Sequence, residues 1–168
     1  MKKTKALIFF VIVTVFVVAA HNLTLCKVSN RTFIPVNLSS EFKQEIKKET
    51  KNMSEEDIVA YCNNKTQEKL TFSTKCEKFD DRRKTKMHCV GYAQVFCSIC
   101  NYAFSVNGIK GKVRPVVGHV YQNGINLNHY SKLLPERWKN FTKDHDFAEV
   151  ILSDGKIVYV DPLLDIIQ

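Results

Sequence analysis

The chain has 168 residues, of which 45% are hydrophobic, and a formal net charge of +8 at pH 7. This composition suits one globular domain with a buried core and excludes a chain that is disordered throughout. The positive charges are dispersed apart from a cluster in residues 82–86, and no basic stripe interleaved with aromatic residues accompanies them. A nucleic-acid partner is therefore not expected.

Residues 1–20 have the pattern of a signal peptide or of an N-terminal anchor. Three lysines lie within the first five residues, an apolar run follows, and its Val-Ala-Ala ending suits cleavage before His21. The run is short for a membrane-spanning helix. The rest of the chain is therefore expected to be exported, as a secreted or periplasmic protein or one that this segment anchors outside the cytoplasm.

The part that follows is expected to hold an irregular arm at residues 21–36 and a single domain at residues 37–168. The arm is rich in Asn, Thr and Ser, whereas residues 40–51 suit a charged helix with an apolar face. Ser54 is typical of a helix N-cap, because acidic residues fill the next turn and Asp57 stands three positions on, as in a capping box. A second helix is expected to begin there.

Residues 75–86 are polar and charged and predict a loop that leads into a helix at residues 89–105. In that helix the apolar residues recur at helical spacing, which indicates a broad buried stripe. Gly108 is expected to end it. The β-branched stretch at residues 112–122 then predicts a strand.

Two further strands are expected at residues 147–153 and 156–160, joined by Asp154-Gly155. That dipeptide between apolar runs is a strong hairpin signal. Helices therefore precede antiparallel strands, which predicts an α+β fold with the N-terminal helices and helix 89–105 packed on a small antiparallel sheet.

Cys89, His145 and Asp161 form the candidate catalytic set. Cys89 begins its predicted helix, where free N–H groups and the positive end of the helix dipole favour a thiolate and can bind an oxyanion. The hairpin brings His145, just before one strand, about opposite Asp161, at the end of the next. A thiol, a base and a carboxylate that orients the base are what cysteine-dependent acyl transfer requires.

Three segments of the sequence resemble the transglutaminase-like superfamily. His-Cys-Val-Gly-Tyr-Ala-Gln-Val-Phe at residues 88–96 is similar to its nucleophile helix, and Asp-His-Asp-Phe-Ala-Glu-Val at residues 144–150 to its catalytic-histidine strand. Residues 154–162, which end in Asp-Pro, resemble the strand that follows. The segments occur in the family's order within residues 85–163. The resemblance implies a papain-like core in which Cys89 is the nucleophile, His145 the base and Asp161 the orienting residue.

The chain also departs from animal members of that family. Phe147 stands where they have Trp shortly after the catalytic His, and the only tryptophan, Trp138, lies upstream. No oxyanion donor beyond the Cys89 backbone N–H is identified. The sandwich and barrel domains and the calcium loops of the animal crosslinking enzymes are also not seen, which weakens the case for crosslinking in particular.

The expected activity is acyl transfer on a peptide or carboxamide bond of a protein or peptide substrate through a thioester, giving hydrolysis or transamidation. No metal or organic cofactor is needed for it. Two alternatives stay open: a binding or structural module that keeps the fold without turnover, and a basic binder of anionic polymers whose affinity would fall with salt.

Several polar or aromatic residues near the candidate set are weaker candidates. His119 and Phe147 are the two that are considered for substrate binding. His88, next to the nucleophile, is expected at the surface, and Asp144 and Asp146 are expected to be solvated or to cap the strand.

The remaining cysteines are assigned structural roles. In an exported protein Cys62 and Cys76 are expected to form a disulfide, with Cys26 as an alternative partner for either. Cys97 and Cys100 lie mid-helix on the buried stripe, so core packing is favoured over a zinc or redox site.

Overall fold

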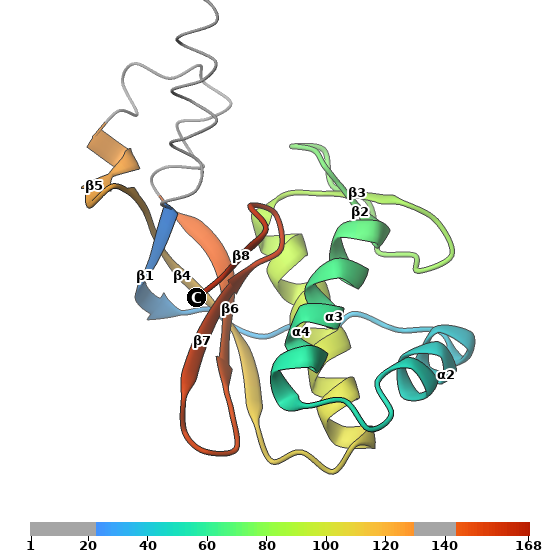
Figure 1. Ribbon diagram of the computed structural model, residues 1–168. Helices are drawn as coiled ribbons and strands as arrows, with labels where there is room; N and C mark the ends of the chain where they lie inside the picture. The colour runs from blue at the N-terminus through green and yellow to red at the C-terminus, as the bar shows by residue number, and fades with distance from the viewer. Residues whose placement is uncertain (1–22, 130–143) are drawn as a thin grey trace, which may run out of the picture.

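A computed structural model describes residues 23–129 and 144–168 (Figure 1). This part of the chain contains helices together with a largely antiparallel sheet, and the expected α+β class is confirmed. The expected signal segment and Trp138 lie outside the described residues.

The three helices of the described ranges are α2 (Ser40–Glu49), α3 (Glu55–Lys69) and α4 (Cys89–Val106). All three were expected from the sequence, although α2 ends two residues before the predicted limit. The α4 helix ends where Gly108 was expected to end it, and Gly108 adopts a positive φ of 69° that suits glycine.

Serine hydroxyls cap the first two helices. Ser39 accepts a hydrogen bond from the N–H of Phe42 at 3.1 Å, and Ser54 accepts one from the N–H of Asp57 at 3.1 Å. The Asp57 carboxylate in turn accepts from the Ser54 hydroxyl at 2.8 Å. The capping signal at Ser54 is therefore confirmed.

The main sheet has six strands in the order β1-β4-β6-β7-β8, and β5 pairs with β4 at its end. All of its pairings are antiparallel. Its strands are β1 (Leu23–Asn30), β4 (Lys112–Gln122), β5 (Ile125–Asn126), β6 (His145–Ile151), β7 (Ile157–Asp161) and β8 (Ile166–Ile167). A separate parallel pair joins β2 (Leu70–Phe72) to β3 (Thr85–Met87). The β2 strand precedes residues 75–86, which were expected to be a loop, and β3 begins in the last two residues of that segment.

The N-terminal arm corrects the prediction most clearly. Residues 23–30, expected to be irregular, form β1 and pair along most of β4. The backbone hydrogen bonds of the segment are thus satisfied by a strand more than 85 residues away in the sequence, which local composition does not reveal. The register between β1 and β4 shifts once, at Val28 between Lys27 and Ser29, as in a β-bulge.

The β6–β7 hairpin has the expected turn. Gly155 has a φ of 87°, and the N–H of Leu152 bonds the carbonyl of Lys156 at 2.9 Å. The first strand begins two residues earlier than predicted, so His145 is the first residue of β6 rather than the residue before the strand. Asp161 is the last residue of β7.

The sheet separates two hydrophobic clusters. On one face α4 packs on β4 and β6 and contacts α2 and α3 (Figure 1). The α3 helix also reaches the turn between β7 and β8, where Asn63 donates a hydrogen bond to Asp165 at 2.8 Å. On the other face Phe147 packs with Leu25, Val116 and Val120. The start of α4 therefore approaches the sheet near the first residues of β6.

In the part of the chain that the structure describes, α4 is long and apolar enough to cross a membrane by length and composition. Most of that helix is buried inside the protein, between the sheet and the other helices. Its packing in the core accounts for its apolar composition.

Candidate active site

Cys89 is the first residue of α4 and is only partly buried. His88 occupies the N-cap position in an extended conformation, and its side chain makes no capping hydrogen bond. The first intrahelical bond runs from the N–H of Tyr92 to the carbonyl of His88 at 3.1 Å. The backbone N–H groups of the first turn therefore point toward the helix end beside the Cys89 thiol.

Gly91 fixes how closely this helix end sits against β3. A Cβ atom at Gly91 would lie 2.6 Å from Sδ and 2.7 Å from Cβ of Met87. Since Cβ of Met87 is attached directly to the backbone, a larger residue at Gly91 would displace β3 or the start of α4. Glycine lets the segment before Cys89 pass close to the helix.

His145 and Asp161 form a fully buried pair. Nε2 of His145 hydrogen-bonds to Oδ2 of Asp161. The other carboxylate oxygen of Asp161 accepts from the backbone N–H groups of Leu163 at 3.0 Å and Leu164 at 3.3 Å. The turn after β7 therefore holds the carboxylate, and the carboxylate fixes the ring of His145.

The pKa of His145 reports on both of its neighbours. Burial alone would lower it, but the charge of Asp161 and the hydrogen bond with it, followed by a hydrogen bond with Cys89 and its charge, raise the pKa to about 9. The structure thus brings Cys89, His145 and Asp161 together, and a charged imidazole is favoured beside the sulfur at neutral pH.

Two further residues belong to the site, of which only Arg31 was not considered from the sequence. Asp146, expected to be solvated or capping, is buried, and its Oδ2 lies 3.9 Å from Sγ of Cys89. Arg31 binds both oxygens of Asp146, from Nε at 2.5 Å and from Nη2 at 2.9 Å. The two are 115 residues apart in sequence, and no local motif links them.

The weaker candidates lie at different depths. Phe147 is fully buried in the cluster on the sheet face opposite the helices, so it does not present a surface to a substrate. His119 lies on β4 and is partly buried. His88 is also partly buried rather than a surface residue, and its Nδ1 has no hydrogen-bond partner among the described residues. Asp144 is exposed, as expected.

The cysteine pairing expected from the sequence is not formed. Cys62 and Cys76 are both free thiols, because Cys62 lies in the core, where its side chain hydrogen-bonds to Cys100, whereas Cys76 is exposed. Burial raises the pKa of the Cys97 thiol, as it does that of Cys62. Cys97 and Cys100 pack in the core, as predicted.

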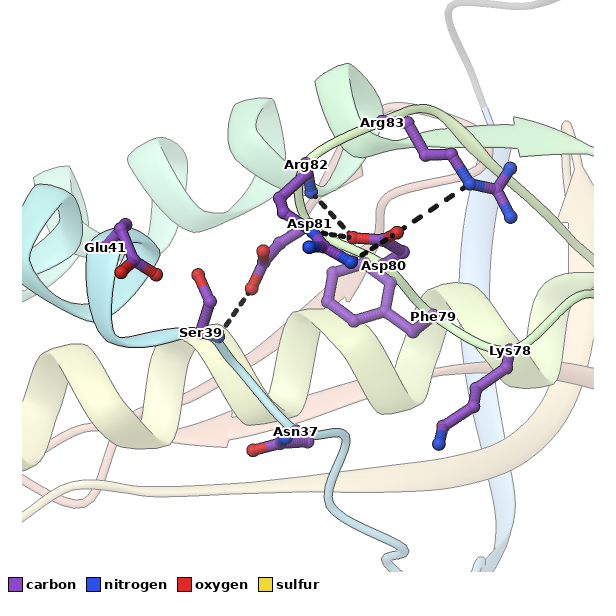
Figure 2. Close-up of a pocket in the computed structure, with 9 residues that line it drawn as sticks. All are labelled: Asn37, Ser39, Glu41, Lys78, Phe79, Asp80, Asp81, Arg82 and Arg83. Carbon is purple, nitrogen blue, oxygen red and sulfur yellow. Dashed lines mark hydrogen bonds and ion pairs between the residues drawn. The ribbon is translucent and has the colours of Figure 1, made fainter.

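A hollow of about 460 Å³ lies away from the candidate set, between the start of α2 and residues 78–83 (Figure 2). Three of its charged residues pair with one another, since Asp80 binds Arg82 at 2.9 Å and Arg83 at 3.8 Å. Asp81 accepts from the Ser39 N–H at 2.7 Å. Within residues 23–129 and 144–168 there is no group of three His, Cys, Asp or Glu side chains that could hold a metal ion.

Comparisons of the chain with profiles of known protein families, with curated proteins and with solved structures found no match. The geometry of the site therefore provides the support for a functional assignment.

Proposed function

We propose that the chain is an exported cysteine-dependent acyl-transfer enzyme with a transglutaminase-like, papain-like core. Its substrate would be a peptide or carboxamide bond in a protein or peptide. The observation that carries the proposal is the contact of the Cys89 thiol, at an uncapped helix start, with His145, whose Nε2 is held by the buried carboxylate of Asp161.

The first half of the reaction forms a thioester. Sγ of Cys89, as a thiolate, attacks the carbonyl carbon, and the carbonyl oxygen becomes an oxyanion that N–H groups at the start of α4 stabilise. The carbon–nitrogen bond then breaks, and the His145 imidazolium gives its proton to the departing nitrogen. The products of this half are a free amine and an acyl group bonded to sulfur.

The second half releases the acyl group. Water or a second amine attacks the thioester carbon, and neutral His145 takes a proton from the attacking atom. The carbon–sulfur bond breaks and returns Cys89 to the thiolate. Water gives a carboxylic acid, which is hydrolysis, whereas an amine gives a new amide, which is transamidation. Asp161 stabilises the charged form of His145 throughout, and no metal or organic cofactor takes part.

A substrate screen tests this proposal. Native protein is incubated with glutamine-containing and other peptides, and the release of ammonia, the incorporation of an amine and the cleavage of peptides are measured. Cys89→Ala is expected to abolish whichever activity is found. Cys76→Ala, which removes an exposed thiol outside the site, is expected to leave it unchanged.

Iodoacetamide labelling provides an independent check. At neutral pH, Cys89 should react faster than Cys26 and Cys76, which are more exposed. Among the described residues neither of these two thiols is hydrogen-bonded to a histidine, although His119 stands opposite Cys26 in the sheet. Preferential labelling of Cys26 or Cys76 would contradict the proposal. Rapid labelling of Cys89 without turnover of any substrate would favour the catalytically silent module.

A further inference from the structure

The carboxylate of Asp146 is placed against the candidate nucleophile. Its side chain is 2% exposed, and Oδ2 lies 3.9 Å from Sγ of Cys89, within the range of a hydrogen bond from the thiol. A carboxylate in that position would repel a thiolate, because both groups carry a negative charge. A buried carboxylate also needs a compensating charge.

Arg31 supplies that charge from the segment after β1. Its guanidinium binds the Asp146 carboxylate with two N–H groups, which fixes the carboxylate in one orientation. The hydrogen bond with Asp146 raises the pKa of Arg31 despite its partial burial, and the charges of Asp146, Cys89 and Asp144 add to this. Arg31 is therefore a permanent cation next to the sulfur.

We propose that Arg31 and Asp146 are positioning residues that set the orientation and protonation of Cys89. The inference rests on the proposed role of Cys89 as nucleophile. When the proton is on sulfur, the S–H group donates a hydrogen bond to Oδ2 of Asp146, and this bond fixes the orientation of the Cys89 side chain. When the proton moves to His145, the S–H bond breaks, an N–H bond forms on the ring, and Arg31 offsets the carboxylate beside the new thiolate.

The other charged or titratable groups around Cys89 are few. His88 precedes it at the N-cap, His145 faces it from β6, and Asp161 lies behind His145. Asp144 is exposed and acts on Arg31 from a distance. Among the described groups, Arg31 and Asp146 are thus a pair of opposite charges whose separate removal should change Cys89 in opposite directions.

The test measures how fast Cys89 reacts with iodoacetamide as a function of pH, by peptide mass spectrometry, in a background with Cys26→Ser and Cys76→Ser. Arg31→Gln leaves the carboxylate uncompensated, so the pH midpoint should rise by about one unit. Asp146→Asn removes the repulsion, so the midpoint should fall by about one unit. The double variant should return close to the native midpoint, because both charges are gone.

Two further variants separate charge from structure. Arg31→Lys keeps the positive charge without the bidentate fork, so its midpoint should stay near the native value. Arg114→Gln is the matched control, since Arg114 pairs with another buried carboxylate of β6, that of Glu149, and its loss should not shift the midpoint. Arg31 is partly exposed, so Arg31→Gln is expected to fold even if Asp146→Asn does not.

Midpoints that move in the same direction in both single variants, or that do not move, would overturn the inference. Opposite shifts that cancel in the double variant would support it. Alkylation does not require turnover. Opposite shifts in a protein without activity would therefore overturn the proposed function but still support the inference that Arg31 and Asp146 act on Cys89.

Discussion

Helices α3 and α4 both begin after an extended N-cap residue, but their first turns differ. At α3, the Ser54 hydroxyl accepts from a backbone N–H, and acidic residues occupy the first turn. At α4, His88 provides no cap, the first turn has no acidic residue, and its first residue is a thiol. The first arrangement gives a hydrogen-bond partner to a backbone N–H at the start of α3. The second leaves the N–H groups and the dipole at the start of α4 available to Cys89 and to a bound group.

This difference implies that the start of α3 stabilises the fold and that the start of α4 gives up some stability for chemistry. Such a trade is common at functional sites. Variants at either helix start, and variants of the residues that approach α4 from the sheet, test this difference between the two helices.

The largest effect is expected from Asp161→Asn. The amide can still accept from the turn, but its NH₂ group would face Nε2 of His145 and favour the wrong tautomer. The value of kcat should fall by about 10³-fold or more, as for the orienting residue of other triads. Steady-state kinetics measure this, with circular dichroism as the folding control. A variant that keeps more than a tenth of native kcat would contradict the orienting role.

The stability of the protein should also depend on pH through His145, the residue of β6 that contacts Cys89 at the start of α4. His145 has a pKa of about 9 when folded, against about 6.5 in an unfolded chain. The folded state binds this proton more tightly, so the stability it provides is complete below about pH 6.5 and is lost as pH rises to about 9. The loss is of the order of a few kcal/mol. Urea unfolding at several pH values tests this; His145→Gln should flatten the profile in that range.

Gly91→Ala should disturb α4 where the matching change in α3 does not. The new methyl group would overlap Met87, so we expect a loss of about 1–3 kcal/mol in the free energy of unfolding, together with slower alkylation of Cys89. Asp57 holds the equivalent third position of α3 and is exposed, so Asp57→Ala should cost less. An unchanged melting temperature in Gly91→Ala would show that β3 can move aside freely.

His88→Ser would give α4 the cap that α3 already has. The new hydroxyl should accept from a first-turn N–H and stabilise the protein by about 0.5–1 kcal/mol. The same bond removes a donor from the site, so alkylation of Cys89 should slow several-fold. Thermal unfolding and labelling rates, measured on one preparation, test both effects. Faster alkylation together with greater stability would contradict the comparison.

The smallest effect on the candidate site is expected from Ser54→Ala. Loss of the cap should cost about 1 kcal/mol, with kcat unchanged. Chemical denaturation and kinetics measure the two quantities. A marked change in kcat would mean that the start of α3 is coupled to the site, in contrast to the division of roles described above.

Sequence signals located the parts of the fold that neighbouring residues determine. Ser54 and Asp57 act within one turn, and Asp154-Gly155 acts within one hairpin, so both were predictable. The hairpin also placed His145 near Asp161, since its register follows from the turn. These local rules identified the three residues that the structure brings together.

The features that were missed depend on distant partners. Residues 23–30 are a strand because β4 offers them a free edge, and their Asn, Thr and Ser content suggested an irregular arm. Asp146 is buried because Arg31 compensates it, and nothing near either residue in sequence indicates the pair. The alternation of Leu23 and Leu25 with polar residues was the one available signal for β1.

The register shift at Val28 determines which side of the sheet each basic side chain of this segment can reach. Before it, Lys27 lies on the same sheet face as the buried carboxylate of Glu149 and pairs with it at 2.7 Å. The extra residue inverts the alternation, so Arg31 turns to the opposite face and reaches Asp146. One edge strand thereby neutralises adjacent acids on both sides of the sheet. Lys27 and Arg31 are four residues apart, so a regular pairing of Val28 with β4 would place both cations on one side and leave Cys89 beside an uncompensated acid.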